Sequence, residues 1–324
     1  MRHAVTRRQA LLAVAGALAG PGALAQPAFN KPIRILVGYP PGGFTDVTAR
    51  LVGQKLQERL GQSVSIENKP GANGILAVEA LARSAPDGSS FAVVIAAHAA
   101  NTTLYPKLPY DPKKDIVPVS LIGLSPLVAA VNNDAPFKTV PELLAFARAN
   151  PGKISFGSSG NGSAAHLSTE LLKSVTNTFM VHIPYRGAAA ALTDLMGGQI
   201  QLFLDAAQGL INPGKSGKVR LIGVAADKRL AALPDTPTFI EQGVAGYTGN
   251  TWAGLLAPAG TPRELVQRVA EEVGRIVKLD DVKKRLDDMG TVPVGNGPAE
   301  FQAFLDAETT KWAQVIRRAK VSVD

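Results

Sequence analysis

The chain alternates short apolar runs, which predict β-strands, with segments of helical periodicity, and this order limits its fold more than any other feature. Residues 33–37 form an apolar run that Pro40-Pro41-Gly42-Gly43 ends, and residues 45–60 then place apolar side chains at helical spacing. The same criteria predict strands at 64–66, 91–95, 153–156, 178–183, 200–204 and 220–225, and helices at 74–82, 164–175 and 298–319. Such alternation is typical of an α/β fold whose mostly parallel sheets are covered by helices on both faces.

Two helices have explicit start signals. In Thr139-Val140-Pro141-Glu142 and in Thr261-Pro262-Arg263-Glu264, a threonine stands at the expected N-cap, a proline in the first turn and a glutamate three residues after the threonine. Both threonines are therefore expected to cap their helices by accepting a backbone hydrogen bond.

Two segments share one design, a strand followed by a glycine-rich loop and a helix. Residues 38–46 follow strand 33–37, and residues 157–163 follow strand 153–156. Ligands of parallel sheets bind at the carboxyl ends of strands, where glycine lets the backbone come close and a helix start offers free N–H groups. Either loop alone could be a plain tight turn, but the pair predicts two lobes that close on one small carboxylate.

Residues 1–25 are typical of an export signal. A basic front precedes an apolar stretch over residues 10–24, and Ala23-Leu24-Ala25 forms a small-x-small cleavage pattern; the basic residues are Arg2, Arg7 and Arg8. The stretch is shorter than the roughly 20 residues that span a bilayer. Cleavage near Ala25 is expected, with the Tat and Sec routes both open because Ala10 stands where the twin-arginine pattern prefers phenylalanine.

Charge and composition remove several classes of function. The 34 lysines and arginines against 26 acids give +8, but the densest basic cluster, Lys283-Lys284-Arg285, is flanked by aspartates, and aromatic residues are only 6%. A nucleic-acid backbone requires an unbalanced basic stripe, so no nucleic-acid partner is expected. The absence of cysteine excludes disulfides, thiolate metal sites, cysteine nucleophiles and a lipid-modified N-terminal cysteine.

Catalytic motifs give no support to an enzyme. The sequence has no GxSxG elbow and no HExxH zinc motif, and we expect no phosphate-binding loop, no catalytic residue, no cofactor and no metal. His166, in the first turn after Ser163, could donate to a carboxylate or be a packed or capping side chain. His182, inside a strand, is expected to be structural. His98, which follows strand 91–95 at the ligand edge of the sheet, is open between the two roles.

The most specific signal is an ordered series of short motifs from about Pro32 to the C-terminus. The motifs are Tyr39-Pro40-Pro41-Gly42-Gly43, Glu67-Asn68-Lys69-Pro70-Gly71-Ala72, Pro86-Asp87-Gly88, Leu108-Pro109-Tyr110-Asp111-Pro112, Gly160-Asn161-Gly162-Ser163, Pro184-Tyr185-Arg186-Gly187, Gly197-Gly198-Gln199, Leu233-Pro234-Asp235-Thr236-Pro237-Thr238 and Ala257-Pro258-Ala259-Gly260-Thr261-Pro262. In their order and spacing they resemble the substrate-binding proteins of tripartite tricarboxylate transporters, the Bug family.

This resemblance implies a bilobal fold like that of type II periplasmic binding proteins, with two mostly parallel sheets flanked by helices and two hinge crossovers. The crossovers are expected near residues 124–131 and in or before residues 252–257. Lobe 1 would then hold 26–125 and 248–324, and lobe 2 would hold 126–247. The implied function is that of a monomeric periplasmic receptor that captures a small carboxylate, an organic acid or amino acid, for the permease subunits of such a transporter. A receptor for the ectodomain of a signalling sensor is the alternative, and an exported enzyme is a remote one.

The resemblance also assigns ligand-binding residues. Lobe 1 would contribute Tyr39, Gly43, Phe44, Thr45 and Asp46, with His98 at the sheet edge, and lobe 2 would contribute Ser158, Gly160, Gly162, Ser163, His166, Arg186, Gly187 and Asp205. Asp46 is also favoured by the helix dipole whether or not it contacts a ligand. Asp205 could accept from the amine of an amino-acid ligand or cap a loop. Arg186 could pair with a distal carboxylate or be solvated.

Overall fold

The computed structural model describes residues 29–323, so the predicted export signal at 1–25 lies outside the described residues. The strands are β1 (Ile33–Val37), β2 (Val64–Asn68), β3 (Ser90–Val94), β4 (Ile116–Val131), β5 (Ser155–Ser158), β6 (Val181–Pro184), β7 (Leu202–Ala206), β8 (Arg220–Val224), β9 (Asn250–Pro258) and β10 (Val292–Pro293). The α-helices are α2 (Phe44–Leu60), α3 (Ile75–Ala82), α4 (Ala97–Leu104), α5 (Val140–Ala149), α6 (Ala164–Thr176), α7 (Ala188–Met196), α8 (Ala207–Lys215), α9 (Arg263–Ile276), α10 (Asp280–Asp288) and α11 (Pro298–Ala319). No helix within 29–323 has the length and apolar character needed to cross a membrane.

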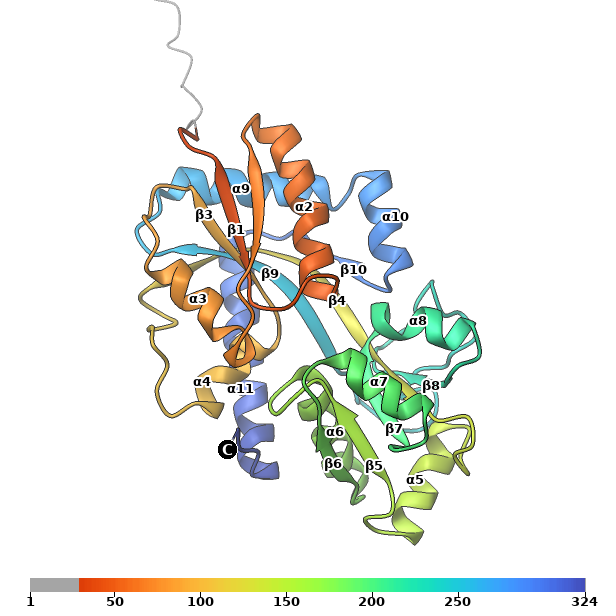
Figure 1. Cartoon of the computed structure of the whole chain (residues 1–324). Helices are drawn as coiled ribbons and strands as arrows, with labels where there is room; N and C mark the ends of the chain where they lie inside the picture. The colour runs from red at the N-terminus through yellow and green to blue at the C-terminus, as the bar shows by residue number, and fades with distance from the viewer. Residues whose placement is uncertain (1–28, 324) are drawn as a thin grey trace, which may run out of the picture.

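The strands form one curled, mixed sheet in the order β2-β1-β3-β9-β4-β7-β5-β6, with β8 and β10 also paired to β4. The outer strands are parallel, as expected: β1 pairs with β2 and β3, and β5 pairs with β6 and β7. The centre differs from the prediction, because β4 and β9 are antiparallel to each other and to their other neighbours. Both strands run between the upper and lower parts of the molecule in opposite directions, which imposes the antiparallel pairing (Figure 1).

Strand β4 is shared by the two parts. Its residues 116–126 pair with β9, whereas residues 127–131 pair with β7 and β8. At the change of partner, the Leu127 N–H donates to the Gly249 carbonyl (2.9 Å). The chain therefore crosses between the two sets of parallel strands close to residues 126 and 249.

Alternate residues of these strands enter different cores. Ile35 of β1 packs in the core with α2 and α9, whereas Leu36 packs with α3, α4 and α11. In β4, Ala129 faces α5 and α6, whereas Val128 faces α7 and α8. Because successive side chains point to opposite faces, strands covered on both faces are continuous apolar runs. This burial explains why the run at 33–37 predicts β1 with both boundaries correct.

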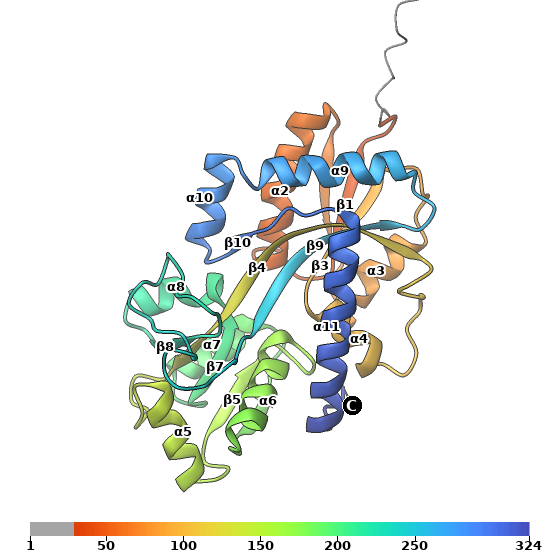
Figure 2. The ribbon, with the colours of Figure 1, turned by 180° about the vertical axis from the view of Figure 1, so that it is seen from behind.

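Helix α11 is fixed to the sheet through a buried carboxylate. Glu308 accepts hydrogen bonds from Nε1 of Trp252 in β9 (3.0 Å) and from Nε1 of Trp312 (2.9 Å), and all three residues are buried. The helix also packs on α4 and on α6, so it lies against both parts of the molecule (Figure 2).

One of the two predicted capping threonines is confirmed. Thr139 Oγ1 accepts from the Glu142 N–H at the start of α5 (3.3 Å). Thr261 does not cap α9, whose N-cap is Pro262; its hydroxyl donates instead to the Pro258 carbonyl (2.7 Å). The Pro258 carbonyl at the end of β9, which also accepts from the Thr261 N–H (3.3 Å), thus takes the hydroxyl that the sequence pattern assigns to the helix.

A phosphate-binding spacing, GxxxxGK[ST], does occur in the sequence, from Gly209 to Ser216. In the structure this stretch lies within and just after α8, with its lysine in the last turn of the helix. A phosphate-binding loop requires the opposite order, in which a glycine-rich loop leads into the start of a helix. The stretch therefore does not form such a loop.

Candidate ligand-binding site

The loop between β1 and α2 leaves the start of α2 without a side-chain cap. Gly42 adopts a left-handed conformation (φ 85°) that turns the chain, and the N-cap residue, Gly43, has no side chain to accept a hydrogen bond. Phe44 and Thr45 are buried, and the Phe44 ring packs in the core, so the backbone N–H groups are what this turn presents. Uncapped N–H groups at the positive end of a helix suit an anion.

Asp46 holds this loop from inside. Its carboxylate accepts hydrogen bonds from the Gly42 N–H (2.9 Å), from Arg50 Nε (3.0 Å to Oδ2) and from Asn68 Nδ2 (2.8 Å), and the residue is only 2% exposed. Burial alone would raise the pKa of Asp46, but the hydrogen bonds from Arg50, Gly42 and Asn68 bring the pKa below its ordinary value. Asp46 is therefore an ionised support of the loop, and its direct contact with a ligand stays a prediction.

The loop between β5 and α6 is tied by hydrogen bonds within itself. Ser158 Oγ donates to the Gly160 carbonyl (3.0 Å) and accepts from the Gly160 N–H (3.2 Å). The Gly162 N–H donates to His166 Nδ1 (3.1 Å), and Ser163 Oγ caps α6 by accepting from the His166 N–H (3.3 Å). Gly160 (φ 131°) and Gly162 (φ 73°) take conformations that other residues rarely adopt. The glycines are thus required by the path of this loop.

His166 is paired with a residue that the sequence analysis assigned to the fold alone. Its ring stacks on that of His182 in β6, with centroids 3.6 Å apart and planes 16° apart. His182 Nε2 lies 2.6 Å from Ser158 Oγ. Burial, then His182 and Lys173, lower the pKa of His166 to about 3, and burial followed by Lys173 lowers that of His182 to about 4. Both imidazoles are therefore neutral at pH 7.

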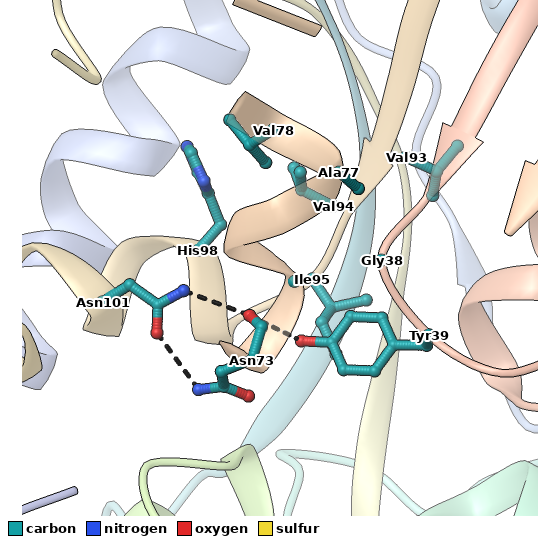
Figure 3. A pocket seen from close by; sticks show the side chains of 11 residues that line it. Gly38, Tyr39, Asn73, Ala77, Val78, Val93, Val94, Ile95, His98 and Asn101 are labelled. Atoms are coloured by element: carbon teal, nitrogen blue, oxygen red, sulfur yellow. Dashed lines mark hydrogen bonds between the residues drawn. The ribbon is translucent and has the colours of Figure 1, made fainter. Parts of the chain in front are cut away.

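The β5–α6 loop lies against the upper part of the molecule. A Cβ at Gly162 would come within 2.2 Å of Leu104 Cδ1 in α4 and within 3.6 Å of Asn73 Nδ2. Asn73 exchanges hydrogen bonds with Asn101 (3.1 Å each) and its carbonyl accepts from the Tyr39 hydroxyl (3.2 Å), as Figure 3 shows. Tyr39 and Gly162, predicted on opposite sides of the site, are thus linked through Asn73.

His98 lies at the same cavity as Tyr39. Both line a cavity of about 10 Å³, which is room for about one water molecule (Figure 3). The His98 ring is buried and stacked on Tyr110 with planes 9° apart, and its Nδ1 has no partner among the described residues. Burial lowers its pKa to about 4 and also raises that of Tyr39. His98 and Tyr39 therefore line the same small cavity, and a direct contact of His98 with a ligand stays a prediction.

The other predicted residues lie at the starts of α7 and α8. Gly187, the N-cap of α7, has φ 105° and no capping side chain, and Arg186 before it is exposed. Asp205 is near the end of β7, directly before α8. In Figures 1 and 2, the starts of α7 and α8 in the lower part of the molecule face the start of α2 in the upper part. The predicted residues thus come from both parts and approach one region.

Residues 48–321 match the family described as "Tripartite tricarboxylate transporter family receptor". The chain belongs to this family. It is therefore a periplasmic solute receptor, and the resemblance to the Bug family and to periplasmic binding proteins is confirmed.

Relatives of this receptor are similar over nearly their whole length. BugT of Bordetella pertussis is 32% identical over 94% of this chain and 94% of BugT. The structure of R. palustris Rpa4515 with adipate shares 33% identity and a TM-score of 0.85, covering 90% of this chain and 98% of that one. MatC of Rhodopseudomonas palustris with bound malate shares 31% identity and a TM-score of 0.79, covering 89% and 99%. These neighbours are binding proteins rather than enzymes.

Asp205 of this receptor carries a testable pH dependence. Burial, opposed in part by the Ala206 N–H, raises its pKa from 3.8 to about 7. The folded protein thus keeps a proton that the unfolded chain releases between these values, so the free energy of unfolding falls as pH rises through this window and is level above it. We expect Asp205→Asn to raise the Tm at pH 8 and to change it little at pH 4. Asp227→Asn, at an exposed position, is the control; an equal shift of Tm at both pH values in Asp205→Asn would contradict the assignment.

The sequence does not reveal the residues of this receptor that hold the predicted site residues in place by hydrogen bonding or stacking. Asn68 lies within a family motif and Asn73 directly follows it, yet nothing in their local pattern showed that they reach Asp46 and Tyr39. His182 could have been found only from the register of two strands, because it lies opposite Phe156 in the β5–β6 pair. Among residues 29–323, no group of three or more His, Asp or Glu side chains is placed to hold a metal ion.

Proposed function

We propose that this receptor captures a small carboxylate between two lobes and delivers it to the membrane permease of a tripartite tricarboxylate transporter. The observation that carries the proposal is the pair of uncapped helix starts, at Gly43 and at Gly187, which face each other from the two parts of the molecule. Backbone N–H groups and helix dipoles stabilise an anion without a direct salt bridge. Closure would replace the water around the carboxylate with these donors and a few bridging waters.

The proposed lobes are residues 26–125 with 248–324, and residues 126–247. The change of partner along β4 at residues 126 and 127, with the return of the chain at Gly249, supports this division. A few residues at two strand crossings are enough to absorb the rotation of a hinge. The β5–α6 loop, which contacts Leu104 across this division, would move with lobe 2.

A dicarboxylate is the ligand class that the site supports best. Adipate and malate, each with two carboxylates, are bound to two of the similar structures. We propose that the helix starts hold one carboxylate and that Arg186, which is exposed beside Gly187, meets the second. Asp205 would serve an amino-acid ligand by accepting from its amine. The sequence after Asp205, Ala206-Ala207-Gln208-Gly209, lacks the asparagine and proline usual in the family, so the identity of the particular acid is not carried over from any relative.

Calorimetry with a panel of mono-, di- and tricarboxylates, amino acids, sugars and inorganic cations tests the proposal. We expect binding only within the carboxylate and amino-acid classes. Arg186→Gln should weaken the binding of a dicarboxylate about 10- to 100-fold, because a charge-assisted pair contributes about 1.5–3 kcal/mol, and should leave the binding of a monocarboxylate unchanged. Arg220→Gln, on the strand β8 far from the helix starts, is the matched control. Binding of sugars or cations alone would contradict the proposed site.

Transport and signalling are separated by a second experiment. Deletion of the gene is expected to abolish uptake of the bound carboxylate. Expression of the intact chain in the deletion strain should restore that uptake. Unchanged uptake together with capture of a sensor ectodomain would favour the signalling role instead. We further propose that the chain is exported to the periplasm with cleavage near Ala25 and acts as a monomer without cofactor or metal.

A further inference from the structure

The stacked histidines lie directly beneath the β5–α6 loop. His166 Nδ1 accepts from the Gly162 N–H (3.1 Å), which places the proton of the neutral ring on Nε2. That Nε2 lies 3.9 Å from Glu170 Oε1. The ring is thus oriented from both sides, with its acceptor toward the loop and its donor toward α6.

His182 supports the other end of the same loop. The Ser158 hydroxyl, which donates to the Gly160 carbonyl and accepts from the Gly160 N–H, also lies 2.6 Å from His182 Nε2. With the hydroxyl proton directed at that carbonyl, His182 Nε2–H donates to Ser158. Phe156 stacks against His182 (4.9 Å), so the pair is enclosed by an aromatic side chain.

We propose that His166 and His182 act together as positioning residues, a stacked pair of neutral imidazoles that fixes the shape of the β5–α6 loop and thereby the affinity for the ligand. The proposal rests on the proposed carboxylate site, because it assigns the loop to the ligand. The pair itself contacts the loop, and the loop contacts the ligand.

Protonation would oppose this arrangement. A proton on His166 Nδ1 would face the Gly162 N–H, so two donors would meet, and a second imidazolium 3.6 Å away would add repulsion. The charged groups around the pair are Glu170 and Lys173 on α6, which pair with each other (2.6 Å). Arg318 of α11 lines the adjoining groove with both of them. Because Lys173 pairs with Glu170, this carboxylate stabilises a charged imidazole less than an unpaired carboxylate would.

Side-chain replacements separate positioning from folding. His166→Asn keeps an acceptor at the place of Nδ1, and His182→Gln keeps a hydrogen-bonding group at the place of Nε2, but neither titrates. We expect the double variant to bind a dicarboxylate at pH 7 within about 3-fold of the unmodified receptor, and His166→Leu to bind it about 10-fold more weakly, because the Gly162 N–H loses its acceptor. The affinity of the unmodified receptor relative to the double variant should fall about 3-fold between pH 7 and pH 4. Titration of the ligand cancels in this ratio, and His98 is present in both proteins.

Amide hydrogen exchange at Gly162 gives a readout that needs no ligand. At pH 7 we expect the Gly162 amide to be protected from exchange in the unmodified receptor and in His166→Asn. In His166→Leu we expect this amide to exchange faster while the Tm of the protein is unchanged. Equal exchange in all three proteins, or an affinity ratio that is constant with pH, would overturn the positioning role. If the receptor binds no carboxylate at all, the proposed function fails, while the exchange result still decides the role of the histidine pair.

Discussion

Gly162→Ala is expected to weaken carboxylate binding about 10- to 100-fold. Two costs add at this position. The left-handed conformation (φ 73°) is unfavourable for alanine by about 1–2 kcal/mol, and the new Cβ would lie 2.2 Å from Leu104 Cδ1. Overpacking of this kind typically costs about 1–3 kcal/mol. Leu104 belongs to the other part of the molecule, so the overpacking hinders the β5–α6 loop from coming close to α4. Because lobe closure requires this approach, the overpacking should weaken binding.

The two costs can be measured separately. Gly217 has nearly the same backbone conformation (φ 70°) but no atom within 4 Å of a Cβ, so Gly217→Ala reports the conformational cost alone. Gly217→Ala should lower the free energy of unfolding by the conformational cost and leave the affinity unchanged. Gly162→Ala should lower the free energy of unfolding at least as much and should also weaken binding. Adding Leu104→Ala should restore part of the affinity lost in Gly162→Ala. If Gly217→Ala weakens binding equally, the contact between the loop and α4 has no part in it.

Glu308→Leu is expected to lower the free energy of unfolding by about 3–5 kcal/mol. The buried carboxylate is the acceptor for Trp252 Nε1 and Trp312 Nε1, and its removal leaves two indole N–H groups unsatisfied in the core. Each such group costs about 1–3 kcal/mol. Glu308→Gln keeps one carbonyl oxygen as an acceptor and should lose less than half as much.

Chemical denaturation followed by tryptophan fluorescence measures this loss. Asp306→Leu, two residues earlier on α11 at an exposed position, makes the same kind of change without burial and should shift stability by no more than about 0.5 kcal/mol. Equal destabilisation by the two leucine variants would show that helix α11 responds to lost charge, and that the indole hydrogen bonds contribute nothing.

The sequence predicts this fold best where a boundary depends on local chemistry. The helix at 298–319 is found residue for residue, since Gly297-Pro298 starts it. The strand predicted at 178–183 is observed at 181–184, because Asn177 first ends α6 in a left-handed conformation and the Thr178 N–H returns to Lys173. Strand β4 was expected only as a crossover, because Pro118 and Pro126 interrupt its apolar pattern.

The sequence predicts the glycine-rich loops of the candidate site, but it does not predict the side chains that hold those loops in place. Glycine spacing indicates the two loops because the turns themselves require glycine. The stacking of His166 on His182 depends on the parallel register of β5 and β6 and on the path of α6, which no local pattern encodes. The same holds for Asn68, which reaches Asp46 only after β1 and β2 have paired.

The path of the crossing strands also sets an order of assembly. Ala92 in β3 pairs with Leu256 in β9, so the strands made first lack their neighbour until most of the chain has been synthesised. By contrast, β5 to β8 find their partners within 127–224. Closing a long loop is entropically unfavourable, so contacts close in sequence form early. The segment in the middle of the chain should therefore fold first. The N-terminal strands should pair only after the C-terminal strands have been synthesised, and until then their apolar edges are exposed to chaperones.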